Sequence, residues 1–105
     1  MPNCRVYVDR RIFRSGEVVY ITLSNVGQET LLIGSWGILR DDGAQVYSVE
    51  PPQIQIPPSS SMLVQWFQQD NEGRQVGRGR YIVVWRPRTL SGVEYFCESQ
   101  VIEIA

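Results

Sequence analysis

Residues 64–85 read VQWFQQDNEGRQVGRGRYIVVW, two apolar segments joined by a long polar connection that contains three glycines. The apolar segments 62–67 and 81–85 each have the length and composition of a β-strand. A connection this polar lies at the surface, and its length suits a chain that leaves one sheet and enters another. The stretch therefore predicts two strands in different sheets of an all-β domain.

The rest of the chain predicts further short strands and no 10-residue amphipathic helix. Gly34 and Gly37 interrupt one of these segments, which predicts a bulge or a close backbone approach. The prolines of 50–61 allow only a short edge strand, and 9–17 is expected to be a polar crossing. The further strands are expected at 4–8, 18–25, 31–40, 44–49 and 93–104, the last with a kink near Ser99.

Short strands with turns at this spacing are typical of an immunoglobulin-like antiparallel β-sandwich of about seven to eight strands in a Greek key. A chain of 105 residues is expected to form one such domain, spanning 1–105. Tyr81 follows Gly79 and Arg80 at the start of a strand, which predicts a tyrosine corner. Val83 and Ile21 stand where antibody domains carry their disulfide, and Trp36 stands at the core tryptophan position.

Three segments, ITLSNVGQETLLI (21–33), WGILRDDGAQVY (36–47) and 64–85, together resemble the bacterial intracellular proteinase inhibitor (BsuPI-like) domain over about residues 18–85. The resemblance implies an Ig-like topology and protease inhibition, but its motifs encode corners of the sandwich and carry no inhibitory residue across. The chain departs from the family pattern at the 57–61 turn and at the 77–79 step, where proline–glycine is usual. A more limited likeness, through SWGILRDDG, is to lamin-tail-type sandwiches.

Composition excludes several kinds of chemistry. The chain has no histidine, which excludes Ser-His-Asp and Cys-His nucleophiles and the common zinc sites. Asp41 and Asp42 could contribute to a calcium site, but a hairpin turn explains them more simply. We therefore expect a protein that is not an enzyme and has no cofactor and no metal.

The two cysteines, Cys4 and Cys97, lie near opposite ends of the sequence. Cysteines in a reducing cytosol are usually free, whereas a bond here would close a loop over most of the chain. The sequence leaves both states open. With no 18-residue apolar span and no signal-peptide core at the N-terminus, we expect a cytoplasmic protein and no membrane contact.

All ten basic residues are arginines, and net charge is −1. The expected topology places basic and acidic side chains together at one end of the sandwich. A mixed pole of this kind favours a network of ion pairs over binding to nucleic acid, which requires unopposed cations. The side chains expected there are Arg10, Arg11, Arg14, Arg74, Arg78 and Arg80 with Asp9, Asp41, Asp42, Asp70 and Glu72.

Two surfaces are candidates for binding a protein partner. If Tyr81, Val83 and Trp85 face the core, Ile82 and Val84 form an outward apolar stripe that suits a partner or a homodimer, unless the adjoining hairpin covers it. The segment 86–93 is expected to be a loop stiffened by proline, from which Arg86 or Arg88 could enter the acidic pocket of a serine protease. An ordinary hairpin loop is the alternative. The candidate residues of this loop are Arg86, Pro87, Arg88, Thr89 and Leu90.

Three functions stay open at this point. The first is an Ig-like domain that inhibits a protease, and the second is an interaction or assembly module without inhibitory activity. The third is a carbohydrate-binding sandwich that stacks sugars on Trp66 or Trp85, which needs those rings exposed. The alternation of side chains places both rings inward, so a protein-binding domain is the favoured prediction.

Overall fold

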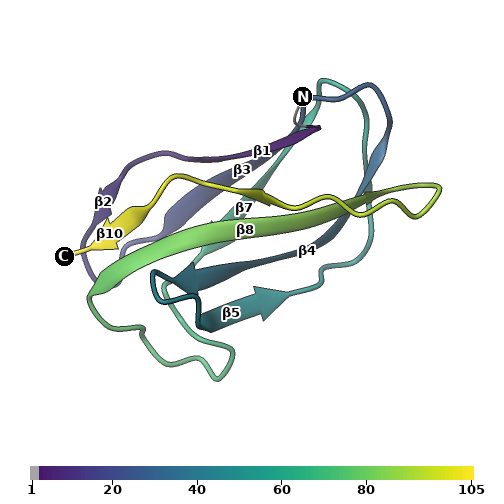
Figure 1. The fold of residues 1–105 in the computed structure, drawn as a ribbon. Helices are drawn as coiled ribbons and strands as arrows, with labels where there is room; N and C mark the ends of the chain where they lie inside the picture. Colours follow the sequence, from purple (N-terminus) through teal and green to yellow (C-terminus); the bar gives the residue numbers. More distant parts are fainter. Residues whose placement is uncertain (1–2) are drawn as a thin grey trace.

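The computed structural model describes residues 3–105, which form two packed β-sheets (Figure 1). One sheet has three strands in the order β1 (Cys4–Val8), β3 (Val19–Asn25) and β7 (Ser61–Trp66). The other has seven, with β2 (Ile12–Phe13), β10 (Ile102–Ile104), β8 (Gly79–Thr89), β4 (Leu31–Arg40) and β5 (Gln45–Val49) in that order. Its two remaining strands are β6 (Gln55–Ile56), which pairs with β4, and β9 (Cys97–Glu98), which pairs with β8.

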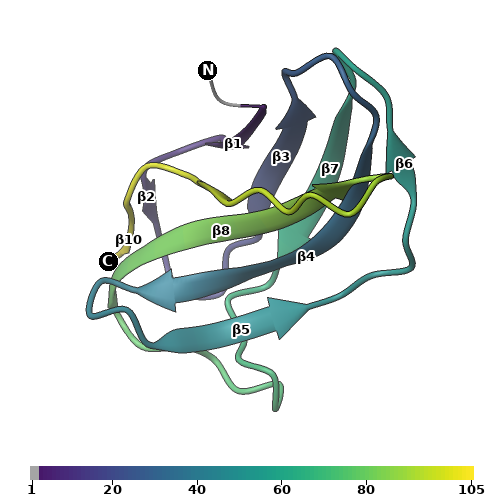
Figure 2. The ribbon, with the colours of Figure 1, turned by 45° about the vertical axis from the view of Figure 1, so that its right-hand side comes forward.

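This arrangement is an Ig-like antiparallel β-sandwich, as the sequence predicted. Strands β7 and β8 lie in different sheets, so the connection 67–78 crosses the end of the sandwich (Figure 2). Within residues 3–105 there is no helix with the length and hydrophobicity that crossing a membrane requires.

Alternating side chains build the core between the sheets. On β3 the side chains of Val19, Ile21 and Leu23 are fully buried, whereas Tyr20 between them is exposed. On β8 the side chains of Tyr81, Val83 and Trp85 face the core in the same way. A strand whose alternate residues are apolar stays in place because a slip by one residue would turn its apolar set outward.

Two segments differ from the prediction. The predicted crossing 9–17 contains β2, which pairs in parallel with β10, so Phe13 enters the core. The predicted strand 93–104 is divided into β9 and β10 at the expected kink. There the Ser99 hydroxyl accepts the Val83 N–H (3.0 Å), so a side chain replaces a backbone carbonyl in the ladder.

Both glycines of β4 have the roles expected of them. Gly34 adopts φ 63° at a register shift between Leu32 and Ser35, which is a bulge opposite β8. A Cβ atom on Gly37 would collide with the Tyr47 carbonyl oxygen of β5. Side chains larger than hydrogen would therefore force β4 away from its neighbours.

Candidate functional site

The hairpin between β8 and β9 projects from one end of the molecule in Figure 1. The predicted loop 86–93 is shorter in the structure, because β8 continues through Thr89 and only residues 90–93 form the turn. Thr89 closes that turn with its N–H donating to the Val93 carbonyl (2.8 Å) and its hydroxyl accepting the Val93 N–H (3.0 Å). Below the turn, the backbone N–H of Tyr95 donates to the Pro87 carbonyl (2.8 Å). The element is a stiff hairpin and not an open loop.

This extension of β8 changes which candidate residues are accessible. Pro87 and Thr89 are buried, and Arg86 and Arg88 are half-buried. The Arg86 guanidinium lies over the Phe96 ring, 5.1 Å from its centroid, which is a cation–π contact. The expectation that Arg86 or Arg88 extends from a free loop is therefore wrong.

Apolar side chains occupy the accessible part of the hairpin instead. Leu90 and Val93 flank the turn with 60% and 52% of their areas exposed, and Phe96 below them is 52% exposed. We call these three residues the hairpin tip. Three large apolar side chains exposed on one short hairpin indicate a binding surface more than isolated surface residues do.

A disulfide anchors the base of the hairpin. Cys97 in β9 is bonded to Cys4 in β1, and their Cα atoms are 6.1 Å apart. Because β1 and β9 belong to different sheets, the bond joins the two layers of the sandwich. Beside it lies a groove of ≈ 360 Å³, lined by Cys4, Arg5, Val6, Tyr7, Phe96, Cys97 and Glu98. The hairpin tip and this groove therefore share Phe96.

The second predicted surface, the Ile82–Val84 stripe, is not available as expected. Ile82 is half-buried and Val84 is fully buried. Val84 lies in the middle of the wider sheet, in register with Gly37 on one side and Glu98 on the other. The expectation of an exposed stripe is therefore wrong at Val84.

All three tryptophans lie in the core. Trp66 and Trp85 are 1% and 0% exposed, and Trp36 is 5% exposed with its ring packed against Tyr47. Two of the indole N–H groups are used internally, since Trp85 donates to the Ile33 carbonyl (2.6 Å) and Trp66 to the Gln69 carbonyl (2.9 Å). A sugar cannot stack on Trp66 or Trp85, so that carbohydrate-binding mode is ruled out.

Polar contacts organise the opposite end of the sandwich. Tyr81 donates its hydroxyl to the Gly77 carbonyl (2.6 Å), which is the tyrosine-corner contact, and burial raises the pKa of this hydroxyl. Gln68, at φ 58°, is fully buried and its amide reaches the 14–17 turn, donating to the Arg14 and Glu17 carbonyls and accepting the Gly16 N–H. The sequence did not predict these hydrogen bonds between the 67–78 connection and the 14–17 turn. The glutamine pair 68–69 is the only signal in the sequence that points toward them.

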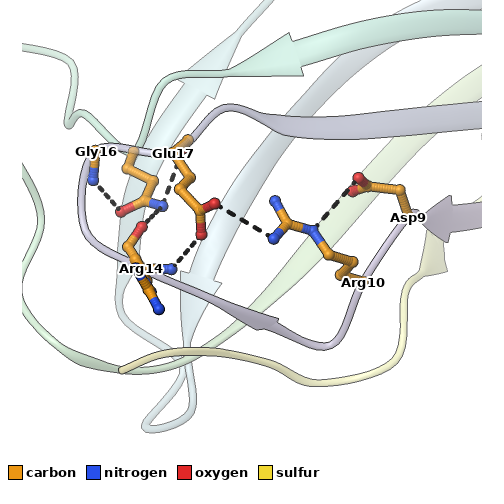
Figure 3. Close-up of polar contacts among 6 residues, drawn as sticks. Asp9, Arg10, Arg14, Gly16 and Glu17 are labelled. Carbon is orange, nitrogen blue, oxygen red and sulfur yellow. Dashed lines mark hydrogen bonds and ion pairs between the residues drawn. The ribbon is translucent and has the colours of Figure 1, made fainter.

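The charged residues form separate local pairs and not one network. Figure 3 shows Glu17 accepting from the Arg14 N–H (2.6 Å) and from Arg10, which also pairs with Asp9. The Arg14 N–H, followed by the Arg10 guanidinium, lowers the pKa of Glu17. Elsewhere Arg40 pairs with Asp42, and Arg74 pairs with Asp70 and Glu72.

Asp42 and Asp70 accept hydrogen bonds from backbone N–H groups of their own turns. The Ala44 N–H lowers the pKa of Asp42, and the Arg74 N–H lowers the pKa of Asp70. Arg40 and Arg74, respectively, lower these pKa values further. Among residues 3–105 there is no group of three or more His, Cys, Asp or Glu side chains arranged to hold a metal ion. These carboxylates therefore act as turn acceptors.

No family model and no curated protein matches the sequence. Solved structures with a similar fold include a structural-genomics target, SoR45, at 15% identity and TM-score 0.63, covering 98% of this chain and 86% of that one. The CARDB domain of the PF1109 protein from Pyrococcus furiosus, solved with di-metal ions, is similar at 9% identity and TM-score 0.52, over 99% of this chain and 89% of that one.

A third similar structure is the alkylpurine DNA glycosylase AlkC of Pseudomonas fluorescens, bound to DNA with an abasic-site analogue. It is 14% identical with TM-score 0.55, and the match covers 100% of this chain but only 31% of the glycosylase. At these identities the three likenesses bear on the fold alone, and all support a β-sandwich.

Proposed function

We propose that this chain is a non-catalytic Ig-like domain that binds a protein partner through the hairpin tip. The observation that carries the proposal is the exposure of Leu90, Val93 and Phe96, each more than half exposed on the same hairpin. The two arginines nearest to these side chains are half-buried, whereas Glu94 beside Val93 is exposed, so the surface offers apolar contact with one carboxylate at its side.

The hairpin is stiff before a partner arrives. Its turn is closed by Thr89, its stem is paired through Arg88 and Glu94, and its base is bonded to β1 through Cys97. A rigid element loses little conformational entropy on binding, so more of the contact energy appears as affinity. This is the physical reason why the tip is a better candidate than an equally apolar flexible loop.

The groove beside the disulfide supplies a place for an anchoring side chain. Tyr7 and Phe96 give it aromatic walls, and Arg5 and Glu98 lie at its margin. Anchors that fill such hollows carry much of the energy of a protein interface. A partner that covers the tip could insert one apolar side chain here.

Protease inhibition is the narrower form of the proposal, supported by the resemblance to BsuPI-like domains. Leu90 is the residue with the exposure that entry into a specificity pocket needs, whereas Arg86 and Arg88 lie in the strand. The corresponding enzymes are therefore serine proteases that accept apolar residues, such as subtilisin-like ones. Without inhibition, the same surface serves an interaction or assembly module.

Nucleic acid and membrane are not part of this proposal, although one structural neighbour was solved with DNA. The arginines nearest the tip are half-buried, and Arg86 is engaged with Phe96. Phosphate binding needs unopposed cations, which this surface does not offer.

The experiment compares the chain with two variants that carry the same substitution at leucines of equal exposure, Leu90→Lys and Leu63→Lys. Each is incubated with subtilisin-like and trypsin-like proteases, and each is used to capture proteins from a lysate of the source cells. A protease inhibited, or a protein captured, by the chain and by Leu63→Lys but not by Leu90→Lys supports the hairpin tip. Equal behaviour of all three contradicts it.

The cellular compartment is linked to the Cys4–Cys97 bond. We propose the cytoplasm from the sequence, but a disulfide persists mainly in oxidising compartments or in disulfide-rich hyperthermophiles. Trapping thiols in intact source cells distinguishes these cases. Two alkylated cysteines support a reducing cytoplasm, and two protected ones contradict it unless the source grows near boiling.

A further inference from the structure

Strand β7 forms an open edge of the three-stranded sheet. No strand of residues 3–105 pairs with the side of β7 that faces away from β3 (Figure 2). The backbone N–H of Asn25 donates to the Ser60 carbonyl (2.9 Å). Counting along the register from there, the hydrogen-bonded pairs of β3 and β7 are Leu23–Met62, Ile21–Val64 and Val19–Trp66. Because the ladder alternates, the N–H and C=O groups of the intervening residues, Ser61, Leu63 and Gln65, point outward.

The open edge lacks the features that normally prevent strand pairing. Natural edges are protected by charged side chains, prolines, bulges or covering segments. Strand β7 has no charged residue and no proline, and its register with β3 is continuous. The proline-rich segment before β7 supplies β6, which pairs with β4 of the other sheet.

The sheet that ends in β7 is almost free of charge. Of all residues in β1, β3 and β7, only Arg5 is charged, and it lies on the strand farthest from β7. Along the chain no charged side chain occurs between Glu50 and Asp70. A partner that recognises its target by charge finds nothing to bind here, whereas a second copy of the same edge meets no like charge.

The outward row of β7 is also symmetric in character. Ser61, Leu63 and Gln65 read polar, apolar, polar along the edge, with Leu63 60% exposed at the centre. A two-fold axis through Leu63 places Leu63 of one copy opposite Leu63 of the other, and Ser61 opposite Gln65. Self-complementarity of this kind is what an isologous dimer interface requires.

The neighbouring side chains extend the apolar surface around that axis. Leu63 is in register with Thr22 of β3, which is in register with Tyr7 of β1. Tyr20 lies two residues before Thr22 on β3. Tyr7 and Tyr20 are 48% and 42% exposed, and Phe67, just after β7, is 55% exposed. Aromatic and aliphatic side chains on adjacent strands stabilise an extended sheet.

We propose that the chain forms a homodimer by antiparallel pairing of β7 with β7 of a second copy. The pairing joins two three-stranded sheets into one of six strands and satisfies the outward backbone groups of Ser61, Leu63 and Gln65. This surface is distinct from the hairpin tip, so the dimer leaves the proposed protein-binding surface free. It also replaces the Ile82–Val84 stripe as the dimer surface.

The test is the molar mass of the chain in solution over a range of concentrations, by light scattering and sedimentation. The chain is expected to have twice the mass of the 12.0 kDa monomer. Leu63→Lys places two ammonium groups at the axis, and we expect its dimer Kd to rise by about tenfold or more. Leu90→Lys, the same change at an equally exposed leucine of the hairpin tip, is expected to leave the dimer unchanged.

A second variant and an exchange measurement keep the test decisive if Leu63→Lys folds poorly. Gln65→Pro removes an outward N–H without breaking a bond to β3, and it is expected to weaken the dimer as well. In the dimer the amide hydrogens of Ser61, Leu63 and Gln65 are expected to exchange slowly.

Three results overturn the proposal: a monomer at all concentrations, a dimer indifferent to both β7 variants, or fast exchange at these three amides in the dimer. A chain that stays monomeric but binds a foreign extended peptide at β7 likewise overturns the assignment to a second copy. Loss of partner capture in Leu90→Lys alone bears only on the hairpin tip, so the two proposals can fail independently.

Discussion

Gln68 is the residue on which the end of the sandwich near the 67–78 connection most depends. Its side chain is fully buried, and both its amide nitrogen and its amide oxygen form hydrogen bonds with the 14–17 turn. The Gln75 side chain also donates to its amide oxygen (3.0 Å). Its backbone holds φ 58°, a conformation that non-glycine residues seldom adopt. A buried amide that is fully bonded stabilises a turn, and the loss of its side chain removes a hydrogen-bond partner from the Arg14 and Glu17 carbonyls and the Gly16 N–H.

Gln68→Ala is expected to lower the free energy of unfolding by about 2–3 kcal/mol, because the partly buried carbonyls of Arg14 and Glu17 lose the donation from its amide. Urea unfolding followed by tryptophan fluorescence measures the change. Gln65→Ala, an exposed glutamine of β7, serves as the control and is expected to change it by less than about 0.5 kcal/mol. Equal losses in the two variants would argue against a role for these hydrogen bonds.

Glu17 predicts a dependence of stability on acid. The Arg14 N–H, then Arg10, lowers its pKa below the ordinary value of 4.5. A carboxyl group with a lowered folded-state pKa contributes stability above its unfolded pKa, and that contribution is lost as pH falls through the folded-state pKa. In Glu17→Gln we therefore expect the urea midpoint to fall less between about pH 5 and about pH 3 than in the unchanged chain. Because the Glu17 carboxyl is exposed, the difference between the two proteins is expected to be small. The same dependence of the urea midpoint on pH in both would show that the contacts of Glu17 contribute no stability.

At the scale of elements, the length of β8 determines what the hairpin can do. The strand reaches Thr89 because β4 offers partners as far as Leu31, past the bulge at Gly34. The arginines of the expected loop therefore become strand residues, and only the turn 90–93 remains accessible. Strand pairing, and not the local composition of 86–93, sets the boundary.

Gly37 tests how closely β4 and β5 approach. Gly37→Ala is expected to destabilise the fold by about 1–3 kcal/mol, because the added methyl meets the Tyr47 carbonyl and one strand must move. Gly77→Ala is the matched control, since a Cβ atom there meets nothing within 4 Å and needs no positive φ. Thermal unfolding of both variants measures the difference. A melting temperature for Gly37→Ala equal to that of Gly77→Ala would contradict the close approach.

At the scale of the whole molecule, the Cys4–Cys97 bond fastens one sheet to the other across a sequence separation of 93 residues. Reduction is expected to lower the free energy of unfolding by about 4–5 kcal/mol, since the unfolded chain regains the freedom that the closed loop removes. Denaturant unfolding with and without reductant measures it. The double variant Cys4→Ala, Cys97→Ala is the control and should not respond to reductant. Two free thiols in the unfolded, unreduced chain would disprove the bond.

Much of the architecture could be read from residue order. The alternation on 18–25 and 81–85, the glycines of 31–40 and the polar crossing 67–78 together predict a sandwich, because each is a local preference that agrees with the others. The inward side of β8 and the tyrosine corner follow from the same periodicity. Turn chemistry and a two-residue period act within a few residues, so the sequence carries them directly.

The candidate surfaces depend on pairing between distant segments. Val84 has the parity of an outward residue yet is fully buried, in the middle of the wider sheet between β4 and β9. The extension of β8, the bond between Cys4 and Cys97, and the open edge of β7 arise in the same way. The periodicity of a strand predicts the face of the sheet on which a side chain lies. Whether that side chain is exposed depends on the neighbouring segments, and only the assembled sheets determine which segments those are.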